Sequence, residues 1–235
     1  MMIRIETMGR LLFRYRSFTP IPVILALLIF IKPIFPFGNE GIDELIDVAG
    51  WCIALIGYGI RMSVNGRWGS FSGLKTTGPY AYTRNPLYLG NFVIGLGMAV
   101  ILGNLSIFFI FLLWFTVQYR SIIFAEECLM RAKFKNRYNN YFGAVPRFFP
   151  SIKANIYKTE GMPAFDWKLA LKREHDCIFG WTIGALFFEM WEDIKVAGFY
   201  SKKEELFALS LMVILISVIW ILVKAWKKRY ITIQN

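Results

Sequence analysis

The sequence predicts an all-α integral membrane protein with about six transmembrane helices, within a range of four to six. Its 235 residues are 56% hydrophobic and only 18% charged, which is more apolar material than one soluble core of this size can bury. Several apolar runs approach or reach the roughly 20 residues that a helix needs to cross about 30 Å of hydrocarbon. The basic residues lie between these runs in an alternating pattern.

Six apolar segments are expected to cross the bilayer. The first carries Lys32 and several prolines, which kink or end a helix, and the fifth is short and carries Glu189. Gly103 and Asn104 separate the third segment from the fourth, which predicts a tight helical hairpin. The segments are 20–37, 45–60, 87–102, 105–119, 177–191 and 206–223.

The chain is expected to have four regions. Residues 1–44 form an N-terminal segment with the first span, which is expected to be a retained anchor because no small-residue cleavage site follows its basic start. Residues 45–150 form the functional core, 151–176 a cytoplasmic linker, and 177–235 a C-terminal pair of membrane helices.

The distribution of Lys and Arg predicts the orientation in the membrane. Segments 1–19, 61–86, 120–176 and 224–235 hold 23 of the 27 basic residues, whereas 38–47 has four acids and no base. By the positive-inside rule, both termini and the two long basic loops are expected to be cytoplasmic. The net charge of +11 has the same topological explanation, and no nucleic-acid partner is expected.

A basic and aromatic segment follows the fourth span. Its aromatic side chains are too many for a solvated linker, so the segment either lies in the headgroup layer or closes over something. These side chains are Phe134, Tyr138, Tyr141, Phe142, Phe148 and Phe149.

The loop before the third span contains a proline-broken motif. Gly78 and Pro79 force a turn, and Pro86 permits a new helix to begin after Asn85. Arg84 is thereby placed beside a helix N-terminus, where an anionic group is stabilised. The alternative interpretation is an ordinary interfacial aromatic belt with a positive-inside arginine.

Two adjacent carboxylates, Glu126 and Glu127, lie where the fourth span leaves the membrane. Ionisable groups at that depth are candidates for function because they are costly without cations or water. The alternative is a helical surface pair between Glu127 and Arg131, four residues further on.

Small residues on the third span allow either helix packing or the close approach of a flat ligand, and packing is the first expectation. They are Gly90, Gly95, Gly97 and Gly103.

The remaining reactive residues give weaker signals. Cys52, Cys128 and Cys177 show neither a disulfide framework nor the spacing of a zinc site, so no metal is expected. His175, between acidic neighbours, is interpreted as a solvated helix end. The chain has no dinucleotide loop, Walker loop or nucleophile elbow.

Three ordered motifs resemble those of the membrane methyltransferases related to isoprenylcysteine carboxyl methyltransferase and the phospholipid N-methyltransferases. The motifs are GPYAYTRNPLYLG (78–90), AEECL (125–129) and FKNRYNNYFGAVPRFFP (134–150). The resemblance implies S-adenosylmethionine as the cofactor, held on the cytoplasmic side between the third and fourth spans and covered by the segment after the acid pair. It also implies a membrane lipid or lipidated acceptor.

The resemblance further implies the site residues. The catalytic positions are Arg84, Glu126 and Glu127. The cofactor-binding positions are Tyr82, Arg84, Asn85, Pro86, Tyr88, Gly90, Glu126, Glu127, Tyr138, Tyr141 and Arg147.

Asn85 departs from the family pattern, which has His at this place. Asparagine still forms hydrogen bonds but does not titrate near neutral pH, so only a positioning role carries over. The acceptor is a prenylcysteine-like carboxylate, a phospholipid amine or a lipid phosphate, and only an amine needs a base, for which Glu126 or Glu127 is the candidate.

Two other functions remain open at this point. The first is a non-catalytic module or small transporter that binds anionic lipid, in which Arg84 and Glu126 would point to solvent or headgroups. The second is a sterol reductase, which the small number of spans disfavours.

Overall fold

The computed structural model describes residues 40–68, 73–151 and 162–234, together with a few positions before residue 31. These residues form five long α-helices and one 3-10 helix, with no strand among them, so the predicted all-α class is confirmed for this part of the chain. The elements are α3 (Glu40–Trp68), η2 (Gly78–Ala81), α4 (Pro86–Ile101), α5 (Leu105–Ala144), α6 (Trp167–Val196) and α7 (Lys203–Gln234). The predicted first span, 20–37, lies largely outside the described residues.

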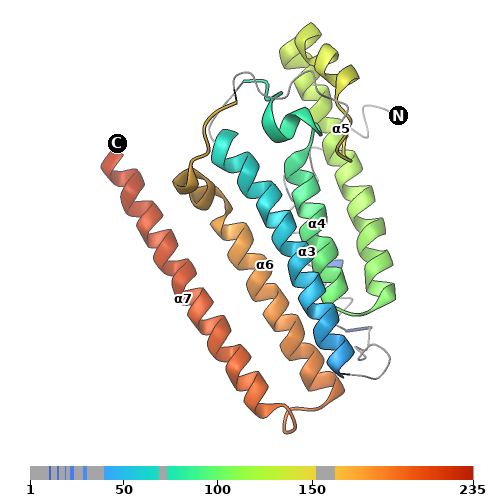
Figure 1. Cartoon of the computed structure of the whole chain (residues 1–235), viewed down its shortest axis with the longest axis vertical. Coiled ribbons are helices and arrows are strands. Elements are labelled where there is room, and N and C mark those ends of the chain that lie inside the picture. The colour runs from blue at the N-terminus through green and yellow to red at the C-terminus, as the bar shows by residue number, and fades with distance from the viewer. Residues whose placement is uncertain are drawn as a thin grey trace.

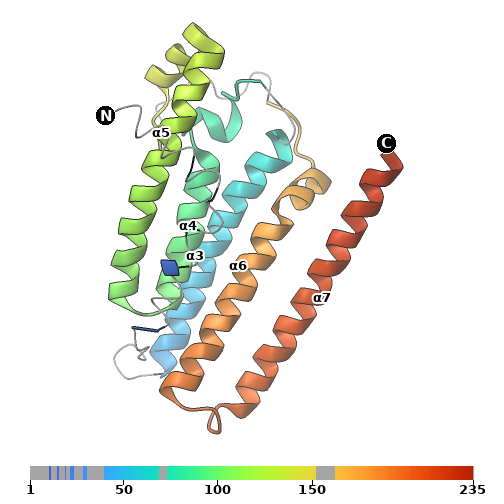
Figure 2. The same ribbon diagram turned by 180° about the vertical axis from the view of Figure 1, so that it is seen from behind.

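The helices stand side by side in the order α5, α4, α3, α6, α7 (Figures 1 and 2). Since successive helices run in opposite directions, α3, α5 and α7 end at the same end of the bundle at which α4 and α6 begin. The largest helix contact is between α3 and α4. The one extensive contact of α7 with another described helix is with α6. The bundle is therefore built on the α3–α4 pair.

Glycines bring α3 and α4 into backbone contact. A Cβ on Gly57 would lie 2.7 Å from the backbone nitrogen of Ile94 and 2.8 Å from the carbonyl oxygen of Gly90. A Cβ on Gly97 would lie 2.5 Å from the carbonyl oxygen of Gly50. Small residues are a common means of close helix packing in membranes, and the predicted packing role is confirmed for Gly90 and Gly97 of α4. Their partners Gly50 and Gly57 on α3 were not among the predicted glycines.

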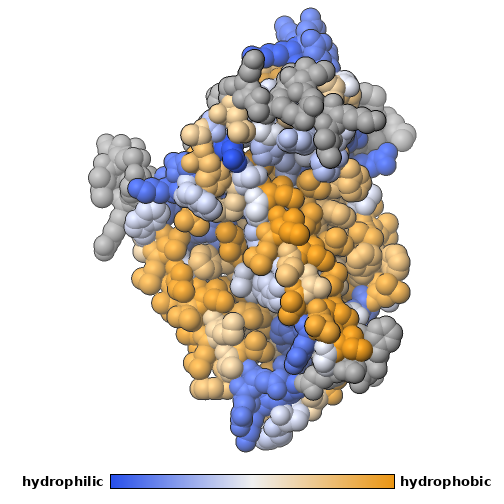
Figure 3. Space-filling model, in the orientation of Figure 1, coloured by the Kyte–Doolittle hydropathy of each residue, from blue (hydrophilic) through white to orange (hydrophobic). Residues whose placement is uncertain are grey.

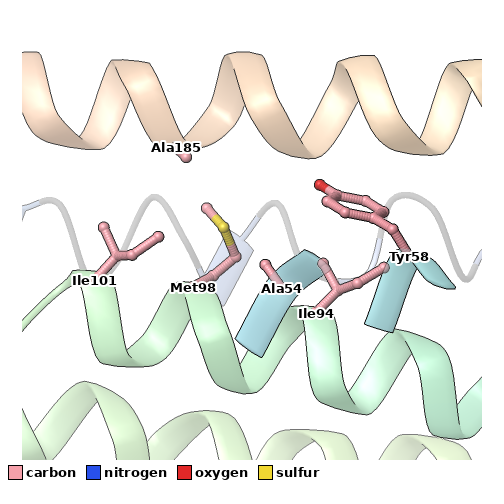
Figure 4. Packing of buried hydrophobic residues seen from close by; sticks show 6 residues of the cluster. All are labelled: Ala54, Tyr58, Ile94, Met98, Ile101 and Ala185. Atoms are coloured by element: carbon pink, nitrogen blue, oxygen red, sulfur yellow. The ribbon is translucent and has the colours of Figure 1, made fainter. Parts of the chain in front are cut away.

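The core beside this contact is apolar and joins three helices. Ala54 and Tyr58 of α3, Ile94 and Met98 of α4, and Ala185 of α6 are buried against one another (Figure 4). This cluster attaches α6, and with it α7, to the α3–α4 pair.

The predicted helical hairpin is present between α4 and α5. Gly103 has a positive φ of 56°, a conformation that glycine adopts without strain. The Asn104 side chain then caps α5 by accepting hydrogen bonds from the backbone N–H groups of Ser106 and Ile107, at 2.9 and 3.3 Å.

The 40-residue α5 changes direction near its C-terminal end. Lys135 has φ 46° and ψ −126°, which is not helical, and the turns after it leave the line of the helix (Figure 1). A non-glycine residue in this region costs of order 1–3 kcal/mol. The break folds residues 136–144 back toward the start of α4.

Three of the described helices are long and apolar enough to cross a membrane. They are Gly41–Trp68, Leu105–Ala144 and Lys203–Lys227. The helix α4 is apolar but shorter, and α6 does not qualify because charged residues flank its apolar stretch on both sides. The predicted count of six spans is therefore not confirmed.

The surface matches a molecule with an apolar middle. Figure 3 shows hydrophobic residues over the centre of the visible face and hydrophilic residues toward both ends. The alternation of helices brings the basic segments 61–68, 73–86 and 120–151 to one end. The first turn of α7, which carries Glu204 and Glu205, lies at the other end. We call the first the basic end.

Replacing Gly57 by alanine is expected to lower the free energy of unfolding by about 1–3 kcal/mol, because the added methyl group meets backbone atoms of α4 that cannot move aside. The matched control is Gly59→Ala on the same helix, where nothing lies within 4 Å of the new Cβ. We expect this control to be neutral or slightly stabilising. Denaturant unfolding in detergent measures both variants, and equal effects would contradict the close packing.

Candidate active site

The motif loop is fixed by backbone hydrogen bonds to the chain that follows α5. The Arg84 N–H donates to the carbonyl oxygen of Pro146 at 2.9 Å, and the Ser151 N–H donates to that of Tyr82 at 3.0 Å. The buried Thr83 adds a side-chain hydrogen bond to the carbonyl oxygen of Phe148 at 2.8 Å. Two motifs more than 60 residues apart in sequence thus form one layer over the start of α4.

A buried carboxylate joins these two motifs to α5. Glu127 contacts Arg84 at 3.0 Å and Arg147 at 2.6 Å, and the side chains of Glu127 and Arg84 are 6% and 7% exposed. Arg147 reaches both carboxylate oxygens, through Nε at 3.3 Å and Nη2 at 2.6 Å. The two arginines neutralise a charge that is costly to bury alone.

Arg84 also packs on an aromatic ring. Its guanidinium carbon lies 3.8 Å from the ring centroid of Phe142, and Nη1 donates to the carbonyl oxygen of Phe142 at 2.7 Å. Arg131 lies over the same ring at 4.0 Å. Arg131, which was the alternative helical partner of Glu127, is therefore part of a cation–π stack.

The neighbouring Glu126 has a different environment. Its Oε1 accepts a hydrogen bond from the hydroxyl of Tyr88 at 2.8 Å, which joins α5 to the first turn of α4. Because adjacent residues on a helix point in different directions, Glu127 contacts the two arginines, whereas Glu126 accepts from the hydroxyl of Tyr88. The two acids of the predicted pair are thus chemically distinct.

Both carboxylates line a cavity of about 490 Å³ at the basic end, a volume typical of pockets for drug-sized ligands. The cavity lies between the start of α4 and the side of α5, with the end of α5 and residues 73–75 around it. Its wall includes the cations Arg61, Lys75, Arg84 and Lys133, and several apolar and aromatic side chains. The latter are Leu74, Tyr80, Leu87, Met130, Phe134, Tyr138 and Tyr141.

Most of the residues named from the sequence line this cavity. Tyr82, Gly90 and Arg147 are not among its lining residues. Tyr82 is 37% exposed, Gly90 faces the side chain of Arg61, and Arg147 acts on Glu127. Those that line it are Arg84, Asn85, Pro86, Tyr88, Glu126, Glu127, Tyr138 and Tyr141.

The sequence interpretation missed four polar lining residues. Arg61, Lys75, Asn91 and Lys133 all contribute to the cavity wall. Arg61 and Asn91 carried a usable signal, since each is a strongly polar residue next to or inside an apolar segment. Lys75 and Lys133 are single basic residues in basic regions, and no sequence pattern separates them from their neighbours.

Two groups beside the motif loop have shifted pKa values. Burial, together with the charge of Arg173, lowers the pKa of Lys75 from its ordinary value. Burial and the negative charge of Glu126 raise the pKa of Tyr80 above its ordinary range. Tyr80 therefore remains a neutral hydroxyl at physiological pH.

His175 is buried at 2% exposure. The expectation of a solvated helix end was wrong for this residue, because it lies on the part of α6 that packs into the bundle. It does not line the cavity.

Comparison with known proteins confirms the resemblance to membrane methyltransferases. Residues 49–137, which run from within α3 to just past the break in α5, match the model of the phospholipid methyltransferase family. No solved structure matches the chain.

Three curated relatives share a segment of similar length. A nickel-cobalt-cadmium resistance protein of Alcaligenes xylosoxydans xylosoxydans is 32% identical over 87 residues, which are 37% of this chain and 39% of that protein. A cobalt-zinc-cadmium resistance protein of Cupriavidus metallidurans is 30% identical over 87 residues, with the same coverage. The protein-S-isoprenylcysteine O-methyltransferase of Schizosaccharomyces pombe is 37% identical over 81 residues, 34% of each chain. The similarity thus covers less than two fifths of each relative.

Replacing Glu127 by glutamine is expected to lower the free energy of unfolding by about 3 kcal/mol, because it leaves the buried Arg84 without a counter-charge. The adjacent Glu126→Gln is the matched control, since its amide oxygen still accepts from Tyr88 and the loss is expected to stay below about 1 kcal/mol. Chemical unfolding in detergent measures both. Equal losses would show that the two arginines do not depend on Glu127.

Proposed function

We propose that this chain is an integral membrane methyltransferase that moves a methyl group from S-adenosylmethionine to a membrane-embedded lipid or lipidated acceptor. The observation that carries the proposal is the cavity of about 490 Å³, because residues of the methyltransferase-like motifs form its wall. Its position supports the methyltransferase over a lipid-binding module, in which Arg84 and Glu126 would point to solvent or headgroups. Here Arg84 is 7% exposed and both residues line the cavity.

The wall has the groups that such a cofactor needs. A carboxylate and a ribose require hydrogen-bond donors, an ammonium group and a sulfonium require negative charge or acceptors, and an adenine requires flat apolar surface. Lys75 supplies a cation and Glu126 an anion, and Tyr138 and Tyr141 supply aromatic surface. The Nε of Arg84 is a buried donor without a partner among the described residues, as expected for an atom that a ligand would satisfy.

When bound, the cofactor supplies a methyl group on a positively charged sulfur, which is already activated for in-line displacement. The role of the protein is then to exclude water and to align the acceptor, and such orientation contributes on the order of 7–11 kcal/mol. The residues of this chain do not need to act as a nucleophile.

The two carboxylates are assigned different roles in the proposal. Glu127 is held by two arginines and keeps the wall in shape. Glu126 accepts a hydrogen bond from Tyr88 and its residue lines the cavity, so we assign it to face the cationic ligand and to receive the proton from an amine acceptor. A carboxylate or phosphate acceptor needs no base.

Asn85 is proposed to position the site. Its Nδ2 donates to the carbonyl oxygen of Arg147 at 2.8 Å, which joins the start of α4 to the loop that carries Arg147. An amide at this place performs a hydrogen-bonding role that does not vary with pH.

Calorimetry with S-adenosylhomocysteine, the demethylated product, tests the cofactor site on the full chain in detergent. We expect saturable binding by the wild type and a dissociation constant about tenfold higher in Glu126→Gln, which keeps the hydrogen bond to Tyr88 but loses the charge. Arg137→Ala is the matched control, a cation at the same end that does not line the cavity. Absence of binding by folded wild-type protein would sink the proposal.

The acceptor class follows from a transfer assay. Protein in vesicles is given cofactor with a radiolabelled methyl group, and the label in extracted lipid is then treated with mild alkali. A methyl ester of a carboxylate releases volatile methanol, whereas the label of an N-methyl group stays in the non-volatile fraction because the C–N bond is not cleaved.

The basic end is proposed to face the cytoplasm, because Lys and Arg collect on that side of membrane proteins. In intact cells, a membrane-impermeant thiol reagent is expected to label Tyr200→Cys, at the opposite end, and not Asn139→Cys, at the basic end. The three native cysteines are first replaced by serine. Labelling of Asn139→Cys alone would reverse the orientation.

A further inference from the structure

A polar network crosses four helices at the floor of the cavity. Arg61 of α3 donates through Nη1 to the side-chain oxygen of Asn91 on α4. The Nδ2 of Asn91 donates to the hydroxyl of Tyr119 on α5 at 3.1 Å. Arg61 and Asn91 both line the cavity, and Asn91 lies about one helical turn after Tyr88 on α4.

The fourth helix of this network is α6, which contributes Glu174 at 1% exposure. Its carboxylate accepts from Nε of Arg61 at 2.7 Å and from Nη2 at 3.0 Å, and it also accepts from Nδ2 of Asn65. A carboxylate with three donors is fully compensated in the interior. Glu174 lies on α6, outside the segment that matches the methyltransferase family model.

The geometry gives Glu174 control over the orientation of Arg61. A two-point contact between a carboxylate and a guanidinium fixes the plane of the guanidinium. Glu174 occupies Nε and Nη2, so that Nη1 is directed to Asn91. Gly90 gives the arginine stem its path, since a Cβ there would lie 2.5 Å from Cγ of Arg61.

The start of α6 is itself anchored to the end of α3. The Asp166 N–H donates to the carbonyl oxygen of Gly66 at 2.9 Å, and the Asp166 side chain caps the first turn of α6. Glu174 is two turns further along, level with Arg61. The position of the carboxylate is thus set by the backbone as well as by its own contacts.

We infer that Glu174 is a positioning residue for the ligand site, which brings the C-terminal helices into the functional unit. It acts through Arg61 and Asn91, which present oriented N–H donors at the cavity floor. Because Glu174 neutralises Arg61, this floor suits an uncharged acceptor such as a hydroxyl or ring nitrogen of the bound cofactor. The inference rests on the proposed function for the identity of the ligand.

The test compares binding and folding in four variants of the full chain. Glu174→Gln removes the charge, Glu174→Asp keeps it on a shorter stem, and the double variant Glu174→Gln/Arg61→Gln removes both charges. Asp176→Asn is the matched control, since Asp176 contacts Trp220 and Lys224 of α7 rather than the cavity. Each protein is measured for its thermal unfolding midpoint and, below it, for its affinity for S-adenosylhomocysteine.

If Glu174 positions the ligand site, changes in affinity for S-adenosylhomocysteine do not simply follow changes in the unfolding midpoint. We expect Glu174→Gln to bind at least tenfold more weakly, Glu174→Asp to recover part of the affinity, and Asp176→Asn to bind within twofold of wild type. The double variant is expected to regain stability, because no uncompensated charge remains buried, but not affinity. If its affinity returned together with its stability, or if folded Glu174→Gln bound like wild type, the inference would be overturned.

A ligand-free measurement distinguishes this outcome from a failure of the proposed function. If the wild type does not bind the probe, hydrogen exchange of the peptide 84–95 decides the inference alone. Glu174→Gln is expected to exchange faster than wild type in this peptide, and Asp176→Asn is expected to match wild type. Equal exchange in all three proteins would overturn the positioning role.

Discussion

The site depends on the compensation of one buried negative charge. Glu127 is fixed on the rigid part of α5, whereas its two cations come from separate loops, before α4 and after α5. A carboxylate at 6% side-chain exposure is costly without partners. The ion pairs with Glu127 therefore hold the loops against α5, and the backbone hydrogen bonds between the loops fix their relative orientation.

Apolar packing between α3, α4 and α6 also supports the site. The glycine contact places α3 and α4 close enough for Arg61 to cross from one helix to the face of the other. The core around Ala54, Ile94 and Ala185 then holds α6 at the same level. The close packing of apolar side chains in the middle of the bundle thus fixes the positions of the helices that carry the polar contacts at the basic end.

Part of this structure could be predicted from the sequence, and the reasons are local. Gly103 and Asn104 specify a turn and a helix cap by their own chemistry, so the hairpin was predictable. The family resemblance predicted that the motifs around Arg84, Glu126 and Arg147 form one site. Most of the site residues predicted from it line the cavity. By contrast, the pairing of Arg61 with Glu174 joins positions 113 residues apart, and no local sequence pattern predicts it. The count of six spans is not confirmed among the described residues, where three helices are long and apolar enough to cross a membrane. Hydropathy alone does not show how a helix with charged residues, such as α6, is accommodated by its neighbours.

The break at Lys135 gives the cavity its form. At the level where Asn91 contacts Tyr119, α4 has only about 8 Å left before it begins at Pro86, whereas α5 continues for about 24 Å to Lys135. The cavity is therefore a step in the height of the bundle, and not a hole through its core. Residues 136–145, folded back by the break, form the roof of that step. Wall and roof belong to one continuous chain, so a shift of α5 against α4 changes the depth and the cover of the cavity together.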